Sequence, residues 1–319
     1  RIFIFTIIFS SLMLVIWHKF NISHELWKIG TNDSQSLWAE KRVAARHLGN
    51  EGKILVGASR IQLGVDVVRM EALTGKNVVQ LAVDGNPYIS ILEGLISDES
   101  ISGTIVVSST VLGLMEDENL KNRAHQYLSY YESKINASFS FATIEAVLSS
   151  QFNIWMPRFS NFVTPYKYFL WSKERLKGAG YLKFNSDRSV DANYSLIDEA
   201  FIYAKRIKRH MGDSQDISIR KIRSFNERIV YINELVSRFE ERGGRVIFVR
   251  FPTSKRIWEI DEGRYPKEVY WDVFAELSIA KTVHFKDYES LSGFDLPDGS
   301  HLDQRDKVKF TENLVDVIF

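Results

Sequence analysis

The sequence lacks cysteine altogether, so neither disulfides nor thiolate metal sites are available to the chain. This absence fits an oxidising compartment without requiring one. An excess of charge of one sign is lacking too: 41 Lys and Arg stand against 40 Asp and Glu, a formal net charge of +1. That balance argues against nucleic acid as the main partner. No metal-ligand cluster and no Gly-rich phosphate loop is recognisable, and we therefore expect no cofactor and no metal.

The chain does have one long apolar stretch, at its N-terminus. Residues Ile2 to Trp17 are apolar apart from three hydroxyl side chains. The stretch is slightly short of the ~20 residues that span a bilayer. No small-residue cleavage site follows it, as a signal peptide would require. We predict a membrane anchor at residues 1–20 with a soluble domain outside the cytoplasm; a buried core helix is the alternative.

The chain has 319 residues, which is long enough for one large core or two small ones. Residues 21–50 are polar and amphipathic, and we expect a juxtamembrane linker followed by a helix. Residues 51–319 are typical of an α/β domain. Short apolar runs predict strands at 53–56, 77–83 and 103–107, with helices between them at 65–73 and 88–96. Strands that alternate with helices favour βαβ units and a parallel sheet.

The pattern changes at about residues 114–216, which are rich in aromatic and basic side chains and show no clear strand. We predict a helical insertion that covers one side of the sheet. Two interpretations of the insertion remain open. It either only packs against the sheet, or it functions as a lid, a membrane-facing surface or a docking face for an integral membrane partner. The α/β pattern then resumes with a helix at 217–242, strands at 245–251 and 281–285, and a last helix at 303–318.

Small or polar residues follow four of the predicted strands: Ser59, Gly85, Ser108 and Arg250. Ligands of open α/β sheets bind at the carboxyl ends of the strands, so these residues are expected to converge although they are distant in sequence. Ser59 is the candidate nucleophile among them.

Asp298 and His301 lie three residues apart in a turn before the last predicted helix. With this spacing His301 can reach the Ser59 hydroxyl with one nitrogen while Asp298 holds the other. The alternative is that Asp298 and Ser300 are turn formers and caps of the terminal helix, a role compatible with catalysis. His284 falls in a predicted strand, and we expect it to be a packed core histidine.

The turn around Ser59 and the turn from Asp298 to His301 together resemble the outer blocks of the SGNH (GDSL-like) hydrolase and acyltransferase superfamily. The first block reads Gly-Ala-Ser-Arg where the family has Gly-Asp-Ser-Leu, so Ala58 replaces the aspartate that organises the turn. The resemblance covers about residues 50–113 and 217–319. It implies a three-layer fold, a parallel sheet flanked by helices, with Ser59, Asp298 and His301 as a catalytic triad.

The resemblance also implies an oxyanion hole built from preorganised N–H donors. Ser59 and Gly85 occupy the positions of the family's first two donors. The usual third donor, an asparagine after the third strand, is absent, and the sequence has Ser108 and Ser109 there. Either serine is a candidate substitute. Asn86 is another, with an ordinary turn as its alternative role.

The replacement of the aspartate by Ala58 and the missing asparagine are departures from the common SGNH motifs. Such departures occur in the membrane-anchored SGNH-like proteins that pair with membrane-bound O-acyltransferases, in alginate and cellulose acetylation and in D-alanyl transfer to teichoic acid. The resemblance thus implies ping-pong transfer. An integral membrane acyltransferase delivers an acyl group such as acetyl, Ser59 takes it up with His301 as general base, and a hydroxyl of a cell-envelope glycan receives it. It places the chain at the bacterial inner membrane, with its domain in the periplasm or outside the cell.

Arg60, Arg250, Tyr270 and Trp271 are candidate contacts for a sugar or a carboxylate, with solvation or packing as the alternative for each. Two other functions remain open. An acyl-esterase would use the same nucleophile with water as the acceptor. A non-catalytic scaffold subunit of a membrane complex would keep the fold alone, which the missing asparagine and Ala58 favour.

Overall fold

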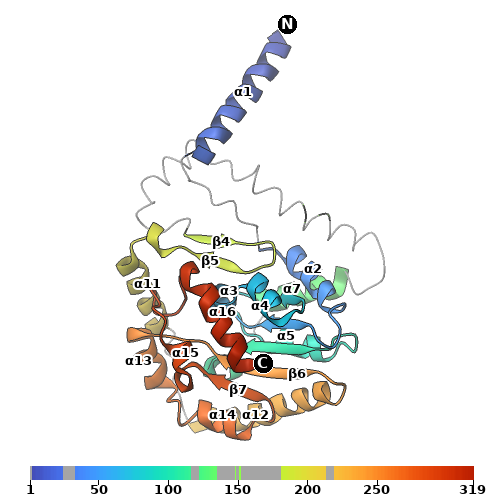
Figure 1. Ribbon diagram of the computed structural model, residues 1–319, viewed down its shortest axis with the longest axis vertical. Coiled ribbons are helices and arrows are strands. Elements are labelled where there is room, and N and C mark those ends of the chain that lie inside the picture. Colours follow the sequence, from blue (N-terminus) through green and yellow to red (C-terminus); the bar gives the residue numbers. More distant parts are fainter. Residues whose placement is uncertain are drawn as a thin grey trace.

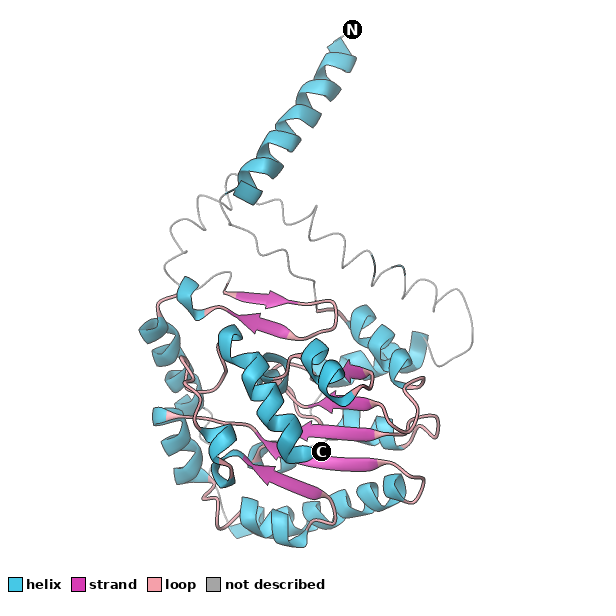
Figure 2. Ribbon diagram, viewed as in Figure 1, coloured by secondary structure: helices cyan, strands magenta, loops and turns pink. Residues whose placement is uncertain are grey.

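The computed structural model describes residues 2–23, 33–115, 122–134, 148, 151, 181–212 and 219–319. From residue 33 onward, the described residues form a layered α/β domain with one central sheet between helices (Figure 1). The strands of this sheet run side by side, and helices cover both of its faces (Figure 2).

The central sheet is parallel throughout. Its strands are β1 (Lys53–Val56), β2 (Val78–Gln80), β3 (Thr104–Ser108), β6 (Arg245–Arg250) and β7 (Lys281–His284), in the order β2-β1-β3-β6-β7. Apart from residues at the strand ends, both faces of these strands are buried, as expected for parallel strands covered by helices on either side. The predicted α/β class is confirmed.

Neighbouring residues of one strand point to opposite faces of the sheet. Ile54 of β1 therefore packs in one core and Leu55 in the other. The first core contains residues of α2 (Gln35–Ala45), α5 (Ile89–Ile96), α6 (Val111–Met115), α7 (Arg123–Lys134), α12 (Ile219–Glu240) and α14 (Trp271–Leu277). The second contains residues of α3 (Ser59–Gly64), α4 (Val67–Thr74), α15 (Glu289–Ser292) and α16 (Gln304–Ile318).

Element boundaries differ from the sequence-based expectations mainly at the carboxyl ends of the strands. β2 is shorter than the predicted strand at 77–83, although Leu81 and Val83 still donate backbone hydrogen bonds to Leu55 and Gly57. The helix predicted at 65–73 is α4, and a separate short helix, α3, precedes it. Ser59 therefore begins a helix rather than lying in an open loop.

The prediction that residues 114–216 contain no strand is wrong. β4 (Leu182–Phe184) and β5 (Val190–Ala192) form an antiparallel hairpin, followed by the short turn η2 (Tyr194–Leu196) and the helix α11 (Glu199–Gly212). Each strand has only three residues, too few for an alternating pattern to stand out. Much of the expected helical insertion, including residues 152–180, lies outside the described residues.

Two buried cations hold this hairpin against the domain. Arg188, in the turn between β4 and β5, donates to the Asp33 carboxylate at 2.7 and 3.0 Å and to the backbone oxygen of Ala82. Lys307 of α16 donates to the backbone oxygen of Val190. Because Ala82 follows β2, the hairpin is fixed beside the carboxyl end of that strand.

The helix α1 (Ile2–Ser23) lies apart from the α/β domain in Figure 1. Its described apolar side chains, among them Phe3, Phe5 and Leu12, are exposed. No helix within the described part of the chain meets the length and hydropathy of a membrane span. The anchor predicted at residues 1–20 stays a prediction.

Candidate active site

A tight turn after β1 presents Ser59. Gly57 in this turn has φ +141°, and a Cβ there would lie 2.8 Å from Ser108 Cβ and 2.9 Å from Ser108 O. Only glycine therefore lets the turn pass so close to the end of β3. Ala58 precedes α3 without a side-chain cap. As the first residue of α3, Ser59 has a backbone N–H without an intrahelical acceptor.

The loop before α16 presents His301. Asp298 Oδ1 accepts backbone N–H bonds from Ser300 at 2.9 Å and from His301 at 2.8 Å, which fixes the turn. The cap of α16 is Asp303, which accepts from the N–H of Arg305. Asp298 is thus a turn former through one carboxylate oxygen, while its second oxygen is left to hold the imidazole.

Ser59, His301 and Asp298 form one chain of hydrogen bonds. His301 Nε2 lies 2.8 Å from Ser59 Oγ, and His301 Nδ1 lies 2.8 Å from Asp298 Oδ2. Asp298 and His301 are buried, and both Ser59 and His301 line a cavity. The order of nucleophile, base and orienting carboxylate is the one that serine-dependent acyl chemistry requires.

Burial and charge set the protonation states of this pair. Burial alone would raise the pKa of Asp298, but the charge and hydrogen bond of His301, followed by Arg206, hold that pKa well below its usual range. Burial lowers the pKa of His301, Asp298 opposes this, and Arg206 and Arg60 add to the lowering. His301 is therefore neutral at pH 7. With its Nδ1 proton on the Asp298 side, its Nε2 lone pair faces Ser59.

Arg206 of α11 is a site residue that the sequence analysis missed. Its Nη2 lies 2.9 Å from Asp298 Oδ2 and 3.2 Å from His301 Nδ1. Since Nδ1 carries the proton that it donates to Asp298, the approach to His301 places a positive charge against the ring rather than forming a hydrogen bond. The signal for Arg206 was weak: it is one of several basic residues in a stretch for which no strand or site was predicted.

Arg60 connects the nucleophile turn to the loop of His301. Its Nε donates to Ser300 Oγ at 3.1 Å, and its Nη2 lies 3.6 Å from Asp261 Oδ2. Burial, followed by the charge of Arg250, lowers the pKa of Arg60 to about 9. The Arg60 guanidinium thus links the turn of Ser59 to the loop of His301, and its role as a substrate contact stays a prediction.

The cavity at Ser59 has a volume of about 230 Å³. Apolar and aromatic side chains of the hairpin, such as Leu182 and Phe184, form one wall. Three cations of α11 (Lys205, Arg206 and Arg209) line it as well. The lining of the cavity therefore combines apolar and cationic side chains with the nucleophile and the carboxylate of Asp84.

The two predicted oxyanion donors from the first blocks lie near this cavity. Ser59 lines it directly. Gly85 takes φ +65°, and the nearest heavy atom to a Cβ there would be Arg209 Nη2 at 3.6 Å, a side chain of the cavity wall. Gly85 therefore lies beside the cavity wall, and its role as an oxyanion donor stays a prediction.

The structure does not bring the other candidate donors to the cavity lining. Asn86 Nδ2 donates to the backbone oxygen of Asp84 at 2.7 Å. Ser109 gives its N–H to Val249 O at 2.9 Å, and its hydroxyl is paired with Tyr88 Oη at 2.7 Å. These contacts hold the local fold together, and neither Asn86 nor Ser109 lines the cavity of Ser59.

The remaining predicted contacts are largely buried. Tyr270 and Trp271 are 3% and 2% exposed and belong to the core beside α12. Arg250 is buried at the end of β6, where it donates to Asp261 Oδ2 at 2.7 Å. His284, at the end of β7, is buried and packs against Trp271. None of the four lines the cavity of Ser59.

Among the described residues, no group of three His, Asp or Glu side chains is placed to hold a metal ion.

No known family model matches the chain, and no curated protein or solved structure matches it. The site is therefore interpreted from its own geometry.

Proposed function

We propose that the protein is an SGNH-like acyltransferase that works through an acyl-serine at Ser59. Ser59 Oγ attacks the carbonyl carbon of an acyl donor while His301 Nε2 takes the hydroxyl proton. The tetrahedral intermediate collapses, its leaving group receives that proton, and the acyl group stays on Ser59 as an ester. An acceptor hydroxyl, deprotonated by His301, then attacks this ester and releases Ser59.

The observation that carries the proposal is the unbroken chain from Ser59 Oγ through both nitrogens of His301 to Asp298, with both links at 2.8 Å. Ser59 lies 242 residues from His301 in the sequence, so the fold, and not chain proximity, brings the nucleophile to the base. The cavity of about 230 Å³ that Ser59 and His301 line supplies room for a substrate next to the nucleophile. Preorganised N–H groups of Ser59 and Gly85 would then stabilise the oxyanion.

The acceptor that we favour is a hydroxyl of a cell-envelope glycan, and the donor an integral membrane acyltransferase. The support for this part is the exposed apolar surface of α1, which fits the proposed anchor at residues 1–20. It would keep the domain at the bacterial inner membrane, on the periplasmic or outer side. The predicted insertion at about 114–216 would then supply the wall of the site through β4, β5 and α11.

Mass spectrometry of the protein after incubation with an activated acetyl ester tests the proposal. An adduct of one acetyl group is expected on Ser59, and it should be absent from Ser59→Ala. Ser109→Ala is the matched control, because Ser109 also follows a strand but is bonded to Tyr88; it should be labelled like the wild type.

The second half-reaction separates the alternatives. Faster loss of the adduct when an oligosaccharide is added, with the acetyl group recovered on the sugar, identifies a transferase. Loss to water alone identifies an esterase. A folded protein that forms no adduct and turns over no ester would contradict the proposal and favour a scaffold subunit.

A further inference from the structure

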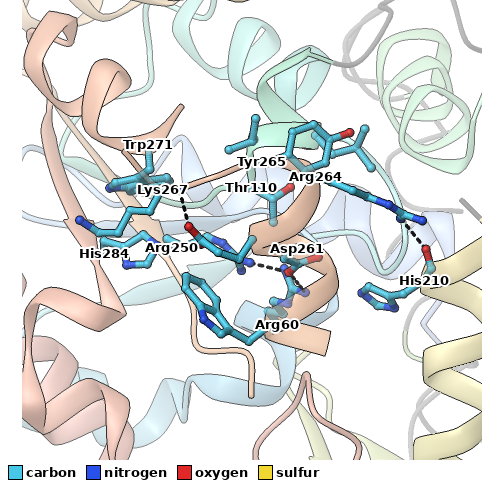
Figure 3. Close-up of a pocket in the computed structure, with 14 residues that line it drawn as sticks. Arg60, Thr110, His210, Arg250, Asp261, Arg264, Tyr265, Lys267, Trp271 and His284 are labelled. Carbon is cyan, nitrogen blue, oxygen red and sulfur yellow. Dashed lines mark hydrogen bonds and ion pairs between the residues drawn. The ribbon is translucent and has the colours of Figure 1, made fainter. Parts of the chain in front are cut away.

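A second cavity has a volume of about 130 Å³, and Figure 3 shows the residues that line it. Its lining includes Thr110 just after β3, Arg250 at the end of β6 and His284 at the end of β7. The helix α13 (Lys255–Arg264) contributes Trp258, among others. Ligands of parallel α/β sheets bind at the edge beyond the carboxyl ends of the strands.

Two consecutive residues, Ser59 and Arg60, line the two cavities. Arg60 lines the second cavity, while the preceding residue, Ser59, lines the first. Consecutive Cα atoms are about 3.8 Å apart. The linings of the two cavities therefore adjoin at Ser59 and Arg60, as the binding of neighbouring units of one chain-like ligand would require.

Two guanidinium groups that line the second cavity, the buried Arg250 and the largely buried Arg60, share one carboxylate. Arg250 Nη2 lies 2.7 Å and Arg60 Nη2 lies 3.6 Å from Asp261 Oδ2 (Figure 3). A third, Arg264, donates to the backbone oxygens of His210 and Met211, which carry no charge. These arginines have fewer counter-charges than charges.

The other charged groups of the lining do not reverse this balance. Glu262 accepts the backbone N–H of Lys267, and the Lys267 ammonium is paired with Asp272 and Asp287. With the Lys267 pairs set aside, three guanidinium groups face the two carboxylates of Asp261 and Glu262. The lining therefore keeps a net positive charge, which favours an anionic ligand.

The walls also present aromatic faces and a neutral donor. The half-buried Trp258 and Tyr265 line the cavity. His284 is held between Trp258 and Trp271, with ring centroids at 5.9 and 5.4 Å. Its Nδ1 accepts the N–H of Lys286, so the neutral ring carries its proton on Nε2. Among the described residues, no acceptor lies within hydrogen-bond range of that Nε2.

We propose that this second cavity binds an anionic sugar unit, one that carries a carboxylate or a phosphate group, next to the unit that reacts at Ser59. Arginine forks bind such groups in two-point fashion, and aromatic walls with a few fixed polar groups are typical of ligand sites. The assignment to the acceptor glycan rests on the proposed function. The binding itself does not require an active nucleophile.

Calorimetric titration of the Ser59→Ala chain tests the inference without any chemistry at the serine. The probes are trigalacturonate, its neutral methyl ester, and maltotriose with and without a phosphate group. At least one charged sugar should bind about tenfold or more tightly than its neutral counterpart, and added salt should weaken that binding. The two charged probes distinguish a carboxylate from a phosphate site.

Arg264→Gln and Trp258→Leu, each in the Ser59→Ala background, should weaken the binding by about tenfold. Arg256→Gln is the matched control: it lies on the same helix, but its side chain is exposed and paired with Glu259. Circular dichroism confirms that each variant is folded. Equal affinity for charged and neutral sugars, or unchanged affinity in both cavity variants, would overturn the inference. Binding without acetylation of Ser59 would instead refute the proposed function and leave the cavity's assignment standing.

Discussion

Arg206 and Asp298 form an ion pair at the centre of the candidate site, with Arg206 Nη2 2.9 Å from Asp298 Oδ2. The same carboxylate oxygen receives the proton of His301 Nδ1. One carboxylate oxygen therefore accepts from two groups. The guanidinium of Arg206 is always charged, whereas the imidazole of His301 becomes charged only during the reaction. The guanidinium favours the ionised carboxylate and disfavours the charged imidazole.

The first prediction concerns the pH dependence that this arrangement produces. Arg206 is one of the causes that lower the pKa of His301. Arg206→Gln removes a positive charge beside the ring, so the pKa of His301 should rise. As the pH is lowered, the neutral form of His301 that acts as the base should then be protonated at a higher pH than in the wild type. The acid limb of kcat/KM for acetyl ester turnover should move to higher pH, with a loss of about tenfold at neutral pH.

Arg209→Gln provides the control for this shift. Arg209 lies on the same helix and lines the same cavity, but it has no contact with Asp298 among the described interactions. Its removal should change KM and leave the acid limb in place. An equal shift in both variants would mean that the general field of α11, rather than the position of Arg206, sets the pKa.

The second prediction is that Asp298→Asn abolishes most activity without unfolding the protein. An asparagine oxygen can still accept the backbone N–H groups of Ser300 and His301, which preserves the turn. Its NH₂ group would donate to His301 Nδ1, so the ring proton would move to Nε2 and face Ser59. We expect kcat to fall by about 10⁴-fold. Asp295→Asn, in the same loop but with its side chain 71% exposed, should have no effect on kcat.

The sequence predicted those features that depend on short local patterns. The strand at 53–56 and Ser59 were recognisable because an apolar run ends in a turn of small residues. Asp298 and His301 were recognisable from their spacing in the turn before the last helix, which resembles the last block of the SGNH superfamily. Arg206 was not, because its role depends on where α11 packs. No local pattern shows which of several basic residues on one helix reaches a buried carboxylate.

The hairpin was missed for a similar physical reason. Its strands pair only over three residues each, and buried ion pairs hold it in place. Arg188 is charged, fully buried and has a positive φ. Arginine is rarely found in such a position, so sequence propensity does not predict it. Tertiary contacts with Asp33 and Ala82 override that preference.

The third prediction follows from the close passage of the nucleophile turn against β3. Gly57→Ala would place a methyl group 2.8 Å from Ser108 Cβ in a backbone conformation that alanine disfavours. The free energy of unfolding should fall by about 2–3 kcal/mol. Gly75→Ala, also at positive φ but with open space around it, should cost about 1 kcal/mol. Urea denaturation measures both, and equal costs would contradict the steric argument.

The fourth prediction concerns the attachment of the hairpin. Arg188→Ala leaves the largely buried carboxylate of Asp33 without its guanidinium partner, at a cost of about 3–5 kcal/mol. Hydrogen exchange should accelerate at residues 181–192 more than in β1 or β3. Lys183→Ala is the control on the same hairpin, because its pair with Asp191 is longer and more exposed, and it should cost about 0.5 kcal/mol or less. Uniform acceleration over the whole domain would show that Arg188 supports the global fold instead of the hairpin.

The last prediction is that His284 makes the fold sensitive to acid. Burial, followed by the charges of Arg250, Lys267 and Lys286, lowers the pKa of His284 to about 2. An imidazole in the unfolded chain binds a proton near pH 6.5, so between about pH 6.5 and 2 the unfolded state holds the extra proton. The free energy of unfolding should therefore decrease as the pH falls through this window, by up to about 1.4 kcal/mol per pH unit from this residue.

His284→Phe keeps the aromatic volume between Trp258 and Trp271 but has no group to titrate. Its free energy of unfolding should fall less steeply between pH 6.5 and 5 than that of the wild type, even where its stability at pH 7 is lower because the Lys286 N–H loses its acceptor. Burial also lowers the pKa values of His210 and His301, so a smaller slope should remain in the variant. Urea denaturation at several pH values measures the slope. Identical slopes in the two proteins would mean that His284 is protonated in the folded state, and that the second cavity carries one more positive charge than its neutral ring allows.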